Sequence, residues 1–537
     1  MKGRDRFLKG VFFLFMIVPV AWSAVAFGAT LNVPSVYSTI QAAVDAAVSG
    51  DTVLVTDGTY SGPGNVNLIV NKPIEIKSEH GPNLCIIDCQ GNGRALTFTG
   101  AETEGSLLSG FTIRGGKVLD KGGGILCENG AKPTIDDCII TGNEARQQVG
   151  TIEMGFGGGI ACVSSSPVIS NCHIEGNGAG YGGGGVFCIG SSPTITGCTI
   201  IGNNCGNSGG GVYMGSKSSP AISSCMVTGN SATLYGGGFY ASGTSSPSIT
   251  NCTVADNSTP NAENTEGGGM YLYYGCQVTI ANAIFWDNSA FQGPEIRMKD
   301  HCNLKVSFSN IKGGKNNIAI DALTLTASTS TASASTLDWS DDTNMDVDPR
   351  FVGEDDYHLA SDSPCVDAGT KEDVTLPESD FEGDPRVLSS STDMGGDEVR
   401  PEPKVYEVKI DVRPGSRHNI IHLGSWGFLP VAVLSTPDFD ATSIDPETVV
   451  FAGAEPVYSV RARVNRDRKA DMLFFFWKRH LKDLNESSTE ATLTGQTTED
   501  LSISGTDTVT IIKPTPKKHW WHNPVHLSQK KGNCNSK

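Results

Sequence analysis

Aromatic and acidic side chains gather around two unusually long connections in an otherwise weakly charged stretch of the chain. Aromatic rings pack against the apolar faces of sugars, and carboxylates accept hydrogen bonds from sugar hydroxyls. This combination favours the binding of a sugar chain, although two tolerated surface insertions are the alternative explanation of the two long connections. The candidate ligand-binding residues are Glu153, Phe156, Tyr181, Tyr235, Glu263 and Glu266.

Catalytic groups are hard to assemble from the same region. Between residues 154 and 255 the only Asp, Glu, Lys or Arg residues are Glu175 and Lys217. A glycoside hydrolase needs two carboxylates about 5–9 Å apart, and Asp136 and Asp137 point to opposite faces if they are neighbours along a strand. We therefore assign no catalytic residue and expect a non-catalytic protein that binds a polysaccharide or a surface protein. A polysaccharide lyase or glycoside hydrolase acting on acidic glycans is the alternative.

Two other groups of side chains carry the oxygen atoms that a hard cation such as calcium prefers. Asp346 and Asp348 belong to an acidic run, for which a solvated loop is the alternative interpretation. Asn465, Asp467 and Asp471 alternate along the chain, but arginines and a lysine lie between them and compete with a bound cation. We expect no cofactor unless calcium binds at one of these places.

The elements that position these residues form a repeat. Gly-Gly-Gly triplets begin at six places, separated by 35, 26, 26, 27 and 31 residues. Between triplets a Pro, an Ile, a Cys, an aliphatic residue and an Asn follow in the same order. The triplets begin at Gly122, Gly157, Gly183, Gly209, Gly236 and Gly267; the Cys column is Cys138, Cys172, Cys198, Cys225 and Cys252; and the Asn column is Asn143, Asn177, Asn203, Asn230 and Asn257.

One such unit cannot bury its own apolar face, whereas stacked copies can. A unit of about 26 residues with short strands fits one coil of a parallel β-helix, and parallel crossovers are nearly always right-handed. We predict an all-β protein with a right-handed parallel β-helix of about ten coils over residues 30–320, capped by a short helix near residues 40–48. The stacked cysteines are expected to be buried free thiols, with disulfides or a metal chain as alternatives. The stacked asparagines are expected to hydrogen-bond along the axis.

Two connections between the Asn column and the next triplet are longer than the rest. Most span six residues, but those over residues 143–157 and 257–267 span 14 and 10. Both leave the same corner of the repeat, four coils apart. We therefore predict that they wall a shallow groove, with Tyr181 and Tyr235 on its floor and the other candidate residues on its walls.

The start of the chain is typical of a secretory signal peptide. Residues 1–26 combine a basic beginning, an apolar run and a small-x-small motif. They carry four basic groups and one acid, so their removal changes the formal charge from −18 to −21. A mature protein this acidic repels nucleic acid, and no later segment is apolar enough to span a membrane. We expect a secreted, periplasmic or cell-surface protein that is a monomer.

The remaining segments differ in composition from the coils. Residues 321–400 begin with a Ser/Thr/Ala-rich stretch and are expected to close the β-helix. Residues 405–513 contain short alternating strands that predict a small β-sandwich-like domain. Residues 514–537 are basic and are expected to be a disordered tail.

Several of these segments resemble known families. Residues 33–44, 50–55 and 58–60 resemble the opening of right-handed β-helix proteins of the pectin-lyase-like superfamily, and the Gly-Gly-Gly coils resemble its parallel β-helix repeat members. The superfamily includes lyases, hydrolases, epimerases and adhesins, so this resemblance implies the fold but no particular activity. Other motifs resemble the segment that closes such helices in exported bacterial proteins; they are residues 348–351, 363–369, 384–386 and 393–396.

A second resemblance concerns the end of the chain. Residues 410–416, 429–436 and 450–454 resemble a small domain that is common in secreted bacterial proteins. That domain usually carries an Asp-rich loop that resembles a calcium site, and residues 465–471 are its counterpart here. The basic residues in this counterpart argue against calcium binding.

Overall fold

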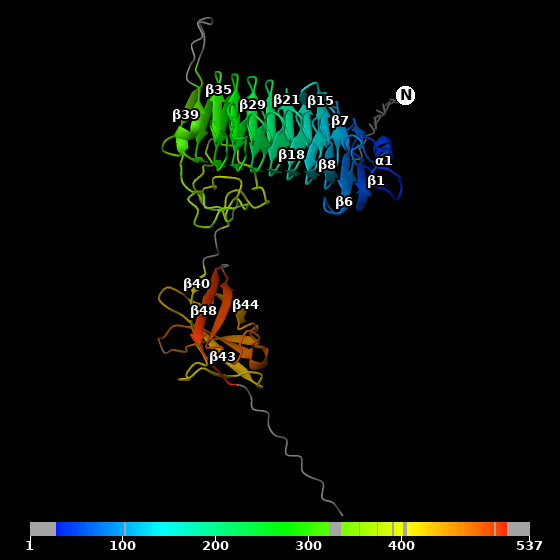
Figure 1. Cartoon of the computed structure of the whole chain (residues 1–537). Coiled ribbons are helices and arrows are strands. Elements are labelled where there is room, and N and C mark those ends of the chain that lie inside the picture. Colours follow the sequence, from blue (N-terminus) through cyan, green and yellow to red (C-terminus); the bar gives the residue numbers. More distant parts are fainter. Residues whose placement is uncertain are drawn as a thin grey trace, which may run out of the picture. The chain divides into compact units, whose positions relative to one another are not determined.

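The computed structural model describes residues 28–100, 104–321, 334–353, 355–372, 374–388, 391–400, 405–465, 467–498 and 501–512. The expected signal peptide and basic tail, residues 1–26 and 514–537, lie outside these ranges. The chain divides into two compact units, residues 1–400 and 401–537 (Figure 1). Each unit has a hydrophobic core of its own.

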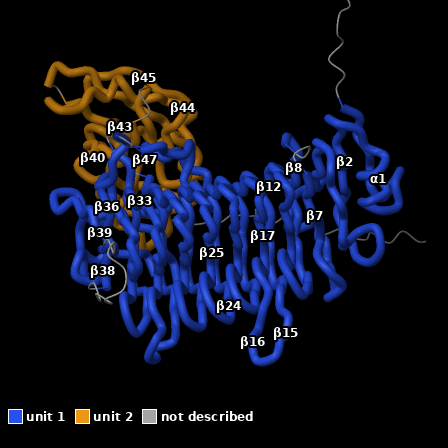
Figure 2. Tube along the Cα trace, turned by 90° about the horizontal axis from the view of Figure 1, so that it is seen from above, with its two compact units in different colours: residues 1–400 blue, residues 401–537 orange. Residues whose placement is uncertain are grey.

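Unit 1 is a solenoid whose coils contribute strands to three long parallel sheets (Figure 2). The first sheet contains, in order, β1 (Thr30–Val33), β2 (Thr52–Val55), β5 (Glu75–Ser78), β8 (Leu107–Ser109), β12 (Thr134–Asp136), β18 (Val168–Ser170), β22 (Thr194–Thr196), β26 (Ala221–Ser223), β30 (Ser248–Thr250), β33 (Gln277–Ala281), β36 (Asn303–Ser307) and β39 (Thr336–Trp339). The second contains β3 (Gly58–Tyr60), β6 (Cys85–Asp88), β9 (Thr112–Arg114), β13 (Ile139–Thr141), β19 (His173–Glu175), β23 (Thr199–Ile201), β27 (Met226–Thr228), β31 (Thr253–Ala255), β34 (Ile284–Trp286) and β37 (Asn310–Ile311).

The third sheet includes the strands that follow the glycine triplets. It contains β4 (Leu68–Val70), β7 (Leu96–Thr99), β11 (Ile125–Glu128), β17 (Ile160–Val163), β21 (Val186–Ile189), β25 (Val212–Gly215), β29 (Phe239–Ser242), β32 (Met270–Tyr273), β35 (Ile296–Lys299) and β38 (Ile318–Ile320). A narrow corner sheet joins β10 (Lys117–Val118), β14 (Glu144–Ala145), β20 (Gly178–Ala179), β24 (Asn204–Cys205) and β28 (Ser231–Ala232).

Equivalent residues of successive coils stack directly on one another. Ile135 pairs with Ile169, and the same column continues through Ile195 and Ile222 to Ile249. Side chains alternate between the two faces of a strand, so this exact repetition places every isoleucine of the column inside. The predicted parallel β-helix of about ten coils is therefore confirmed.

The cysteine column also lies inside, as predicted. All 14 cysteines in the described part of the chain are buried and free of disulfides. Cys127, Cys162 and Cys188 form the second, shorter column by direct pairing of β11, β17 and β21. Burial raises the pKa of thiols such as Cys172 and Cys225 well above the ordinary range, so these cysteines act as small apolar side chains.

The asparagine ladder (Asn143, Asn177, Asn203, Asn230, Asn257 and Asn288) runs buried along one corner. Each side-chain amide donates to the oxygen of the next, as in the 3.0 Å bond from Asn177 Nδ2 to Asn203 Oδ1. The last amide, Asn288 Nδ2, donates to Glu295 Oε2 over 2.6 Å. The predicted hydrogen bonding along the axis is confirmed.

A short helix covers the first coil. Helix α1 (Ile40–Ala46) begins after Thr39, whose hydroxyl accepts a hydrogen bond from the Ala42 amide. Its buried side chains are Ile40, Ala43 and Val44, and it contacts β1, β2 and β4. The predicted capping helix is thus present. Among the described residues, no helix has the length and apolar character needed to cross a bilayer.

The part of the chain after residue 320, which was expected to close the β-helix, still contributes a strand to the solenoid before it becomes irregular. The parallel stack extends past the expected boundary at residue 320, because β39 pairs in register with β36. A single 3₁₀ turn, η2 (Gly314–Asn317), precedes β38 in the described chain. Residues 340–400 then pack against the outside of the last coils through Leu359, Cys365 and Met394. We call residues 340–400 the closing segment.

Unit 2 is built from two four-stranded sheets and one short pair of strands around its own core. One sheet contains β40 (Tyr406–Glu407), β48 (Ser502–Thr508), β47 (Glu490–Thr497) and β44 (Ile444–Phe451), and the other contains β41 (Lys409–Val412), β43 (Phe428–Leu434), β46 (Asp471–Trp477) and β45 (Tyr458–Ala462). The short pair is β42 (Ile420–His422) and β49 (Thr510–Ile512), and the 3₁₀ turns are η3 (Ala441–Ser443) and η4 (Lys478–His480). The predicted small all-β domain is therefore present.

Candidate functional site

The two long connections predicted from the repeat form distinct loops at one corner of the solenoid. The first contains an antiparallel hairpin of β15 (Gln147–Val149) and β16 (Ile152–Met154), which projects beyond the coils (Figure 2). The second is exposed over residues 260–264. It is held closed by the Thr265 hydroxyl, which donates to the carbonyl oxygens of Pro260 and Ala262.

A groove of about 420 Å³ lies between these loops. Arg146 and Glu153 come from the first loop, and Thr259 and Pro260 come from the second. The prediction that the loops wall a common groove is therefore correct. The floor crosses three coils of the corner sheet and is formed by Asn204, Cys205, Gly206, Ser231, Ala232, Thr233 and Ser258.

Arg146 dominates the electrostatics of this corner groove. Its guanidinium donates to Glu153 Oε2 over 3.0 Å and to Asn204 Oδ1 over 2.5 Å. Its Nε atom also lies 3.0 Å from Glu144 Oε1. Glu144 is also paired with Lys117, whose Nζ atom lies 3.0 Å from Glu144 Oε2. The two cations and the two carboxylates balance, and the lining side chains other than Arg146 and Glu153 are uncharged.

A buried hydroxyl group of the corner groove lacks a hydrogen-bond partner. Thr259 is 4% exposed, and its hydroxyl has no hydrogen-bond partner among the described residues. Buried polar groups nearly always have a partner from the protein or from water. A polar ligand or an ordered water in the groove would supply one.

The structure separates the residues that the sequence predicted to act together. Glu153 lines the groove and Glu263 is exposed on the second loop. Tyr181 and Tyr235 are absent from the groove lining, so their predicted place on its floor is wrong. Tyr181 lies against Phe156, with ring centroids 5.5 Å apart, and Tyr235 lies against Tyr271 at 4.8 Å.

Those tyrosines border a stack of aromatic rings that sequence reasoning missed. The aromatic stack consists of Phe187, Tyr213, Tyr240 and Tyr271 on the outer face of the third sheet, with successive centroids 5.0, 4.8 and 5.6 Å apart. The sequence did contain a signal for this stack, because each of its members stands four residues after the start of its glycine triplet. The rings face one another, so each covers the face that a sugar would otherwise use.

Glu266 belongs to a separate group of charges next to the aromatic stack. It is 5% exposed and accepts a hydrogen bond of 2.8 Å from Lys299 Nζ. Arg297 lies 3.6 Å from the other carboxylate oxygen and is paired in turn with Asp321. Glu266 is thus neutralised within the fold. Phe156, Glu263 and Glu266 are absent from the groove lining, so of the predicted wall residues only Glu153 lines the groove.

The predicted calcium ligands are engaged with the backbone around them. Asp346 and Asp348 are exposed, and each accepts a hydrogen bond from a nearby amide, of Gly313 and Arg350 respectively. In unit 2, Asn465 donates to Asp467 over 3.0 Å. Both oxygens of the buried Asp471 accept backbone amides, at 2.9 and 2.8 Å. Calcium binding at either place stays a prediction.

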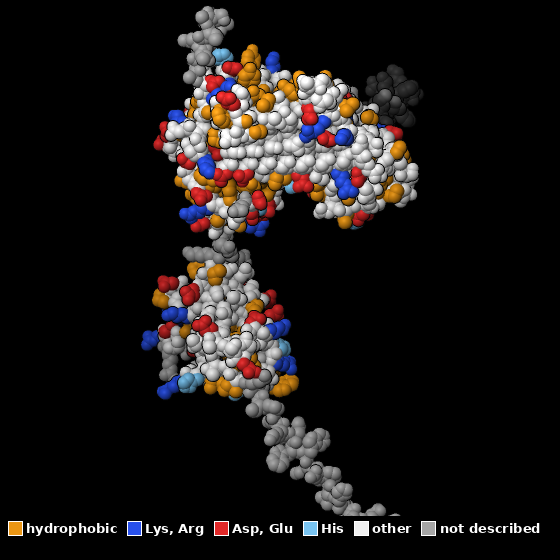
Figure 3. Space-filling model, viewed as in Figure 1, with side chains coloured by type: hydrophobic (Ala, Val, Ile, Leu, Met, Phe, Trp, Pro, Cys, Tyr) orange, Lys and Arg blue, Asp and Glu red, His pale blue; other side chains and the backbone are white. Residues whose placement is uncertain are grey.

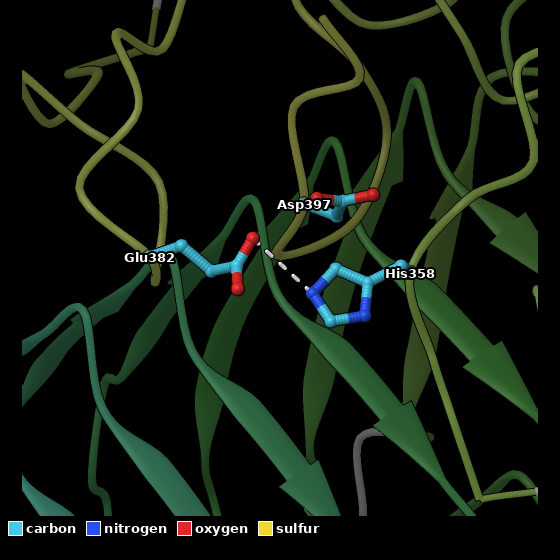
Figure 4. Close-up of side chains that lie close together, drawn as sticks. All are labelled: His358, Glu382 and Asp397. Atoms are coloured by element: carbon cyan, nitrogen blue, oxygen red, sulfur yellow. Dashed lines mark ion pairs between the residues drawn. The ribbon is translucent and has the colours of Figure 1, made fainter. Parts of the chain in front are cut away.

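The sequence analysis also missed a group in the closing segment, formed by His358, Glu382 and Asp397 (Figure 4). Their potential ligand atoms all lie within 4.8 Å of one another. The residues are 24 and 15 positions apart, in a stretch without a repeat. Spacing alone gave no indication that they meet.

The fold and its corner groove define a class of protein: a parallel β-solenoid with a polar groove where two long loops interrupt its repeat. Residues 65–206 and 205–336 match the family described as right handed beta helix region, and together these matches cover about half of the chain. The chain belongs to this family, and the predicted hand of the solenoid is thereby confirmed. No sequence among the curated proteins matches the chain.

Proposed function

We propose that this right-handed β-helix protein is an exported, non-catalytic glycan-binding protein and that a neutral glycan chain occupies the corner groove. The observation that carries this proposal is the floor of the groove, where Asn204, Ser231, Thr233 and Ser258 present amides and hydroxyls from successive coils. Successive coils rise by about 4.8 Å. A polymer of repeating hydroxylated units would therefore meet the same kinds of polar group at each coil.

The charge of the groove favours a neutral glycan over an acidic one. Arg146 already contacts the carboxylates of Glu144 and Glu153, so it has little positive charge to offer to an anionic sugar. Glu153 remains an acceptor for ligand hydroxyls, because its side chain is 47% exposed. On the face shown in Figure 3, a broad band without charged side chains runs along the coils, which also suits a neutral ligand.

The number of acids in the corner groove supports binding without cleavage. Glu153 is the one carboxylate among the described lining residues, and it is paired with Arg146. Glycoside hydrolysis uses two carboxyl groups on either side of the scissile bond. The pattern of residues 1–26 supports export, and a glycan at the cell surface or outside the cell is the partner that such a location offers.

The test is affinity electrophoresis of the purified chain in gels that contain neutral or acidic polysaccharides. Arg146→Ala removes the charge-assisted hydrogen bonds that orient Glu153 and Asn204 in the groove. Such bonds contribute about 1.5–3 kcal/mol each, which corresponds to roughly tenfold to a hundredfold in affinity. Ser231→Trp should also weaken binding, because an indole ring would fill the floor. Binding of neutral glycans should therefore fall in both variants.

The matched control is Arg114→Ala. Arg114, like Arg146, is an arginine in an ion pair, with Asp88 at 2.9 Å, but it is absent from the groove lining. This variant should bind as the parent chain does. If R146A and S231W retain the affinity of R114A, or if no polysaccharide is bound, the proposal is wrong. Release of reducing or unsaturated sugar ends during incubation would refute the non-catalytic assignment.

A further inference from the structure

Three side chains of the closing segment converge from separate loops. His358 follows Phe351, which pairs with Leu359 across a bridge. Glu382 belongs to the loop closed by a bridge between Ser379 and Pro385, and Asp397 lies near the end of unit 1. Figure 4 shows the imidazole of His358 and the carboxylates of Glu382 and Asp397 at the corners of a triangle.

The distances within this group suit the coordination shell of a small divalent ion. His358 Nε2 lies 3.3 Å from Glu382 Oε2. Two ligands bound tetrahedrally at about 2.0–2.1 Å from one zinc ion are themselves about 3.3 Å apart. All three potential ligand atoms are within 4.8 Å of one another, and Glu382 is half exposed, so rotation of its side chain can complete the shell.

Asp397 is the buried member of the group. It is 6% exposed, and its Oδ2 atom accepts a hydrogen bond of 2.8 Å from the Leu359 amide, which fixes the direction of the carboxylate. A buried carboxylate is costly unless a cation or a donor neutralises it. A metal ion held together with His358 and Glu382, whose potential ligand atoms lie within 4.8 Å, would neutralise it.

The outer contacts hold these ligands in the orientation that metal binding requires. His358 Nδ1 hydrogen-bonds to Asp356 Oδ1, which leaves Nε2 directed at Glu382 and Asp397. Metal-ligating histidines usually donate their second ring nitrogen to a carboxylate in this way, which fixes the tautomer. Phe381 packs beside the imidazole, with ring centroids 5.3 Å apart, and provides an apolar wall.

We propose that His358, Glu382 and Asp397 bind one divalent transition-metal ion, with Zn²⁺ the best fit, and that the ion clamps the three loops of the closing segment together. An imidazole nitrogen with carboxylate oxygens suits zinc and its neighbours in the first transition row, whereas calcium takes oxygen ligands. Three protein ligands leave one tetrahedral position for water. The site is separate from the corner groove and does not depend on glycan binding.

The experiment titrates the full chain, produced without a polyhistidine tag and stripped with a chelator, with Zn²⁺ by isothermal calorimetry. Other histidines of the chain can also bind zinc, so the measurement is the difference in stoichiometry from His358→Gln. That variant and Asp397→Asn should each lose one equivalent of high-affinity zinc. Because Glu382 is half exposed, Glu382→Gln should keep the fold and weaken the site at least tenfold.

His173→Gln is the matched control. His173 Nε2 lies 2.8 Å from Glu175 Oε2, so it is also a histidine paired with a carboxylate on unit 1, but it belongs to no group of three potential ligands within the described residues. It should retain the full stoichiometry. Zinc should also raise the thermal unfolding midpoint of the parent chain and of H173Q, but not that of H358Q. Equal stoichiometry in the parent and in both E382Q and H358Q would overturn the proposal, as would a calcium affinity equal to that for zinc.

Discussion

Removal of one amide from the middle of the asparagine ladder tests whether the coils are held together by this buried hydrogen-bond chain. In Asn203→Ala, the alanine lacks both the acceptor and the donor of the native side chain. Asn203 Oδ1 accepts from the backbone amide and the side-chain amide of Asn177, each over 3.0 Å. Asn203 Nδ2 donates to Ile174 O over 2.9 Å and to Asn230 Oδ1 over 3.0 Å.

The cost follows from what is left unpaired. The backbone N–H of Asn177 would lose the acceptor it uses, and an orphaned buried donor costs about 1–3 kcal/mol. Asn177 Nδ2 keeps its bond to Ile140 O, and Asn230 Oδ1 keeps the backbone amide of residue 203. The other three lost bonds, those of Asn177 Nδ2, Ile174 O and Asn230 Oδ1, therefore cost about 1 kcal/mol each. We expect the free energy of unfolding to fall by about 4–6 kcal/mol.

The assay is urea unfolding followed by far-ultraviolet circular dichroism. The matched control is Asn92→Ala, because Asn92 is exposed and its side-chain amide donates one hydrogen bond, to Gln90 O over 3.3 Å. That change should cost less than about 1 kcal/mol. If N203A is no less stable than N92A, the ladder contributes little and the reasoning is wrong.

Two further predictions concern buried titratable groups. Burial raises the pKa of Glu295 from 4.5 to about 8, so the folded state binds a proton that the unfolded state releases. The stability that this bound proton contributes is fully present below pH 4.5, and it should fall by on the order of 4 kcal/mol as the pH rises to about 8. Glu295→Gln should flatten this part of a plot of urea midpoint against pH. An unchanged slope in the variant would contradict the assignment. The 14 described cysteines are buried, so at most one of the 15 thiols of the native protein should react with a disulfide reagent. All 15 thiols should react in the urea-unfolded protein. A larger number in the native protein would show that the cysteine columns are accessible.

The repeat made most of the solenoid predictable. A column such as Ile135 and its successors recurs at a fixed place in each coil, and such repetition requires one strand register throughout. The two long loops were also predictable, because they are departures from a regular spacing. The directions of side chains around the corner that carries the two long loops were harder to predict. Phe156, Tyr235 and Glu266 occupy one bridged column, but Tyr181 stands one residue away from it, and the column faces the aromatic stack instead of the groove.

The closing segment shows where prediction from the sequence ends. His358, Glu382 and Asp397 meet because irregular loops fold back on the last coils, packing through residues such as Leu359 and Met394. No repeat relates these loops, so no spacing rule brings their side chains together. Arg146 is an isolated arginine in the sequence. Its contacts with Glu144, Glu153 and Asn204 are made only in the folded structure, so its place in the groove could not be predicted.

The asparagine ladder has a direction. Every side-chain amide donates toward the C-terminal end, from Asn143 through to Asn288, and the final donor meets the Glu295 carboxyl. A duplicated coil inserted between two rungs would bring one acceptor and one donor in the same order, so it would leave no bond unmade. Solenoids of this type can therefore grow by whole coils in their middle. The ladder itself ends at Glu295, because its carboxyl accepts from the last amide in place of the asparagine that a further rung would supply.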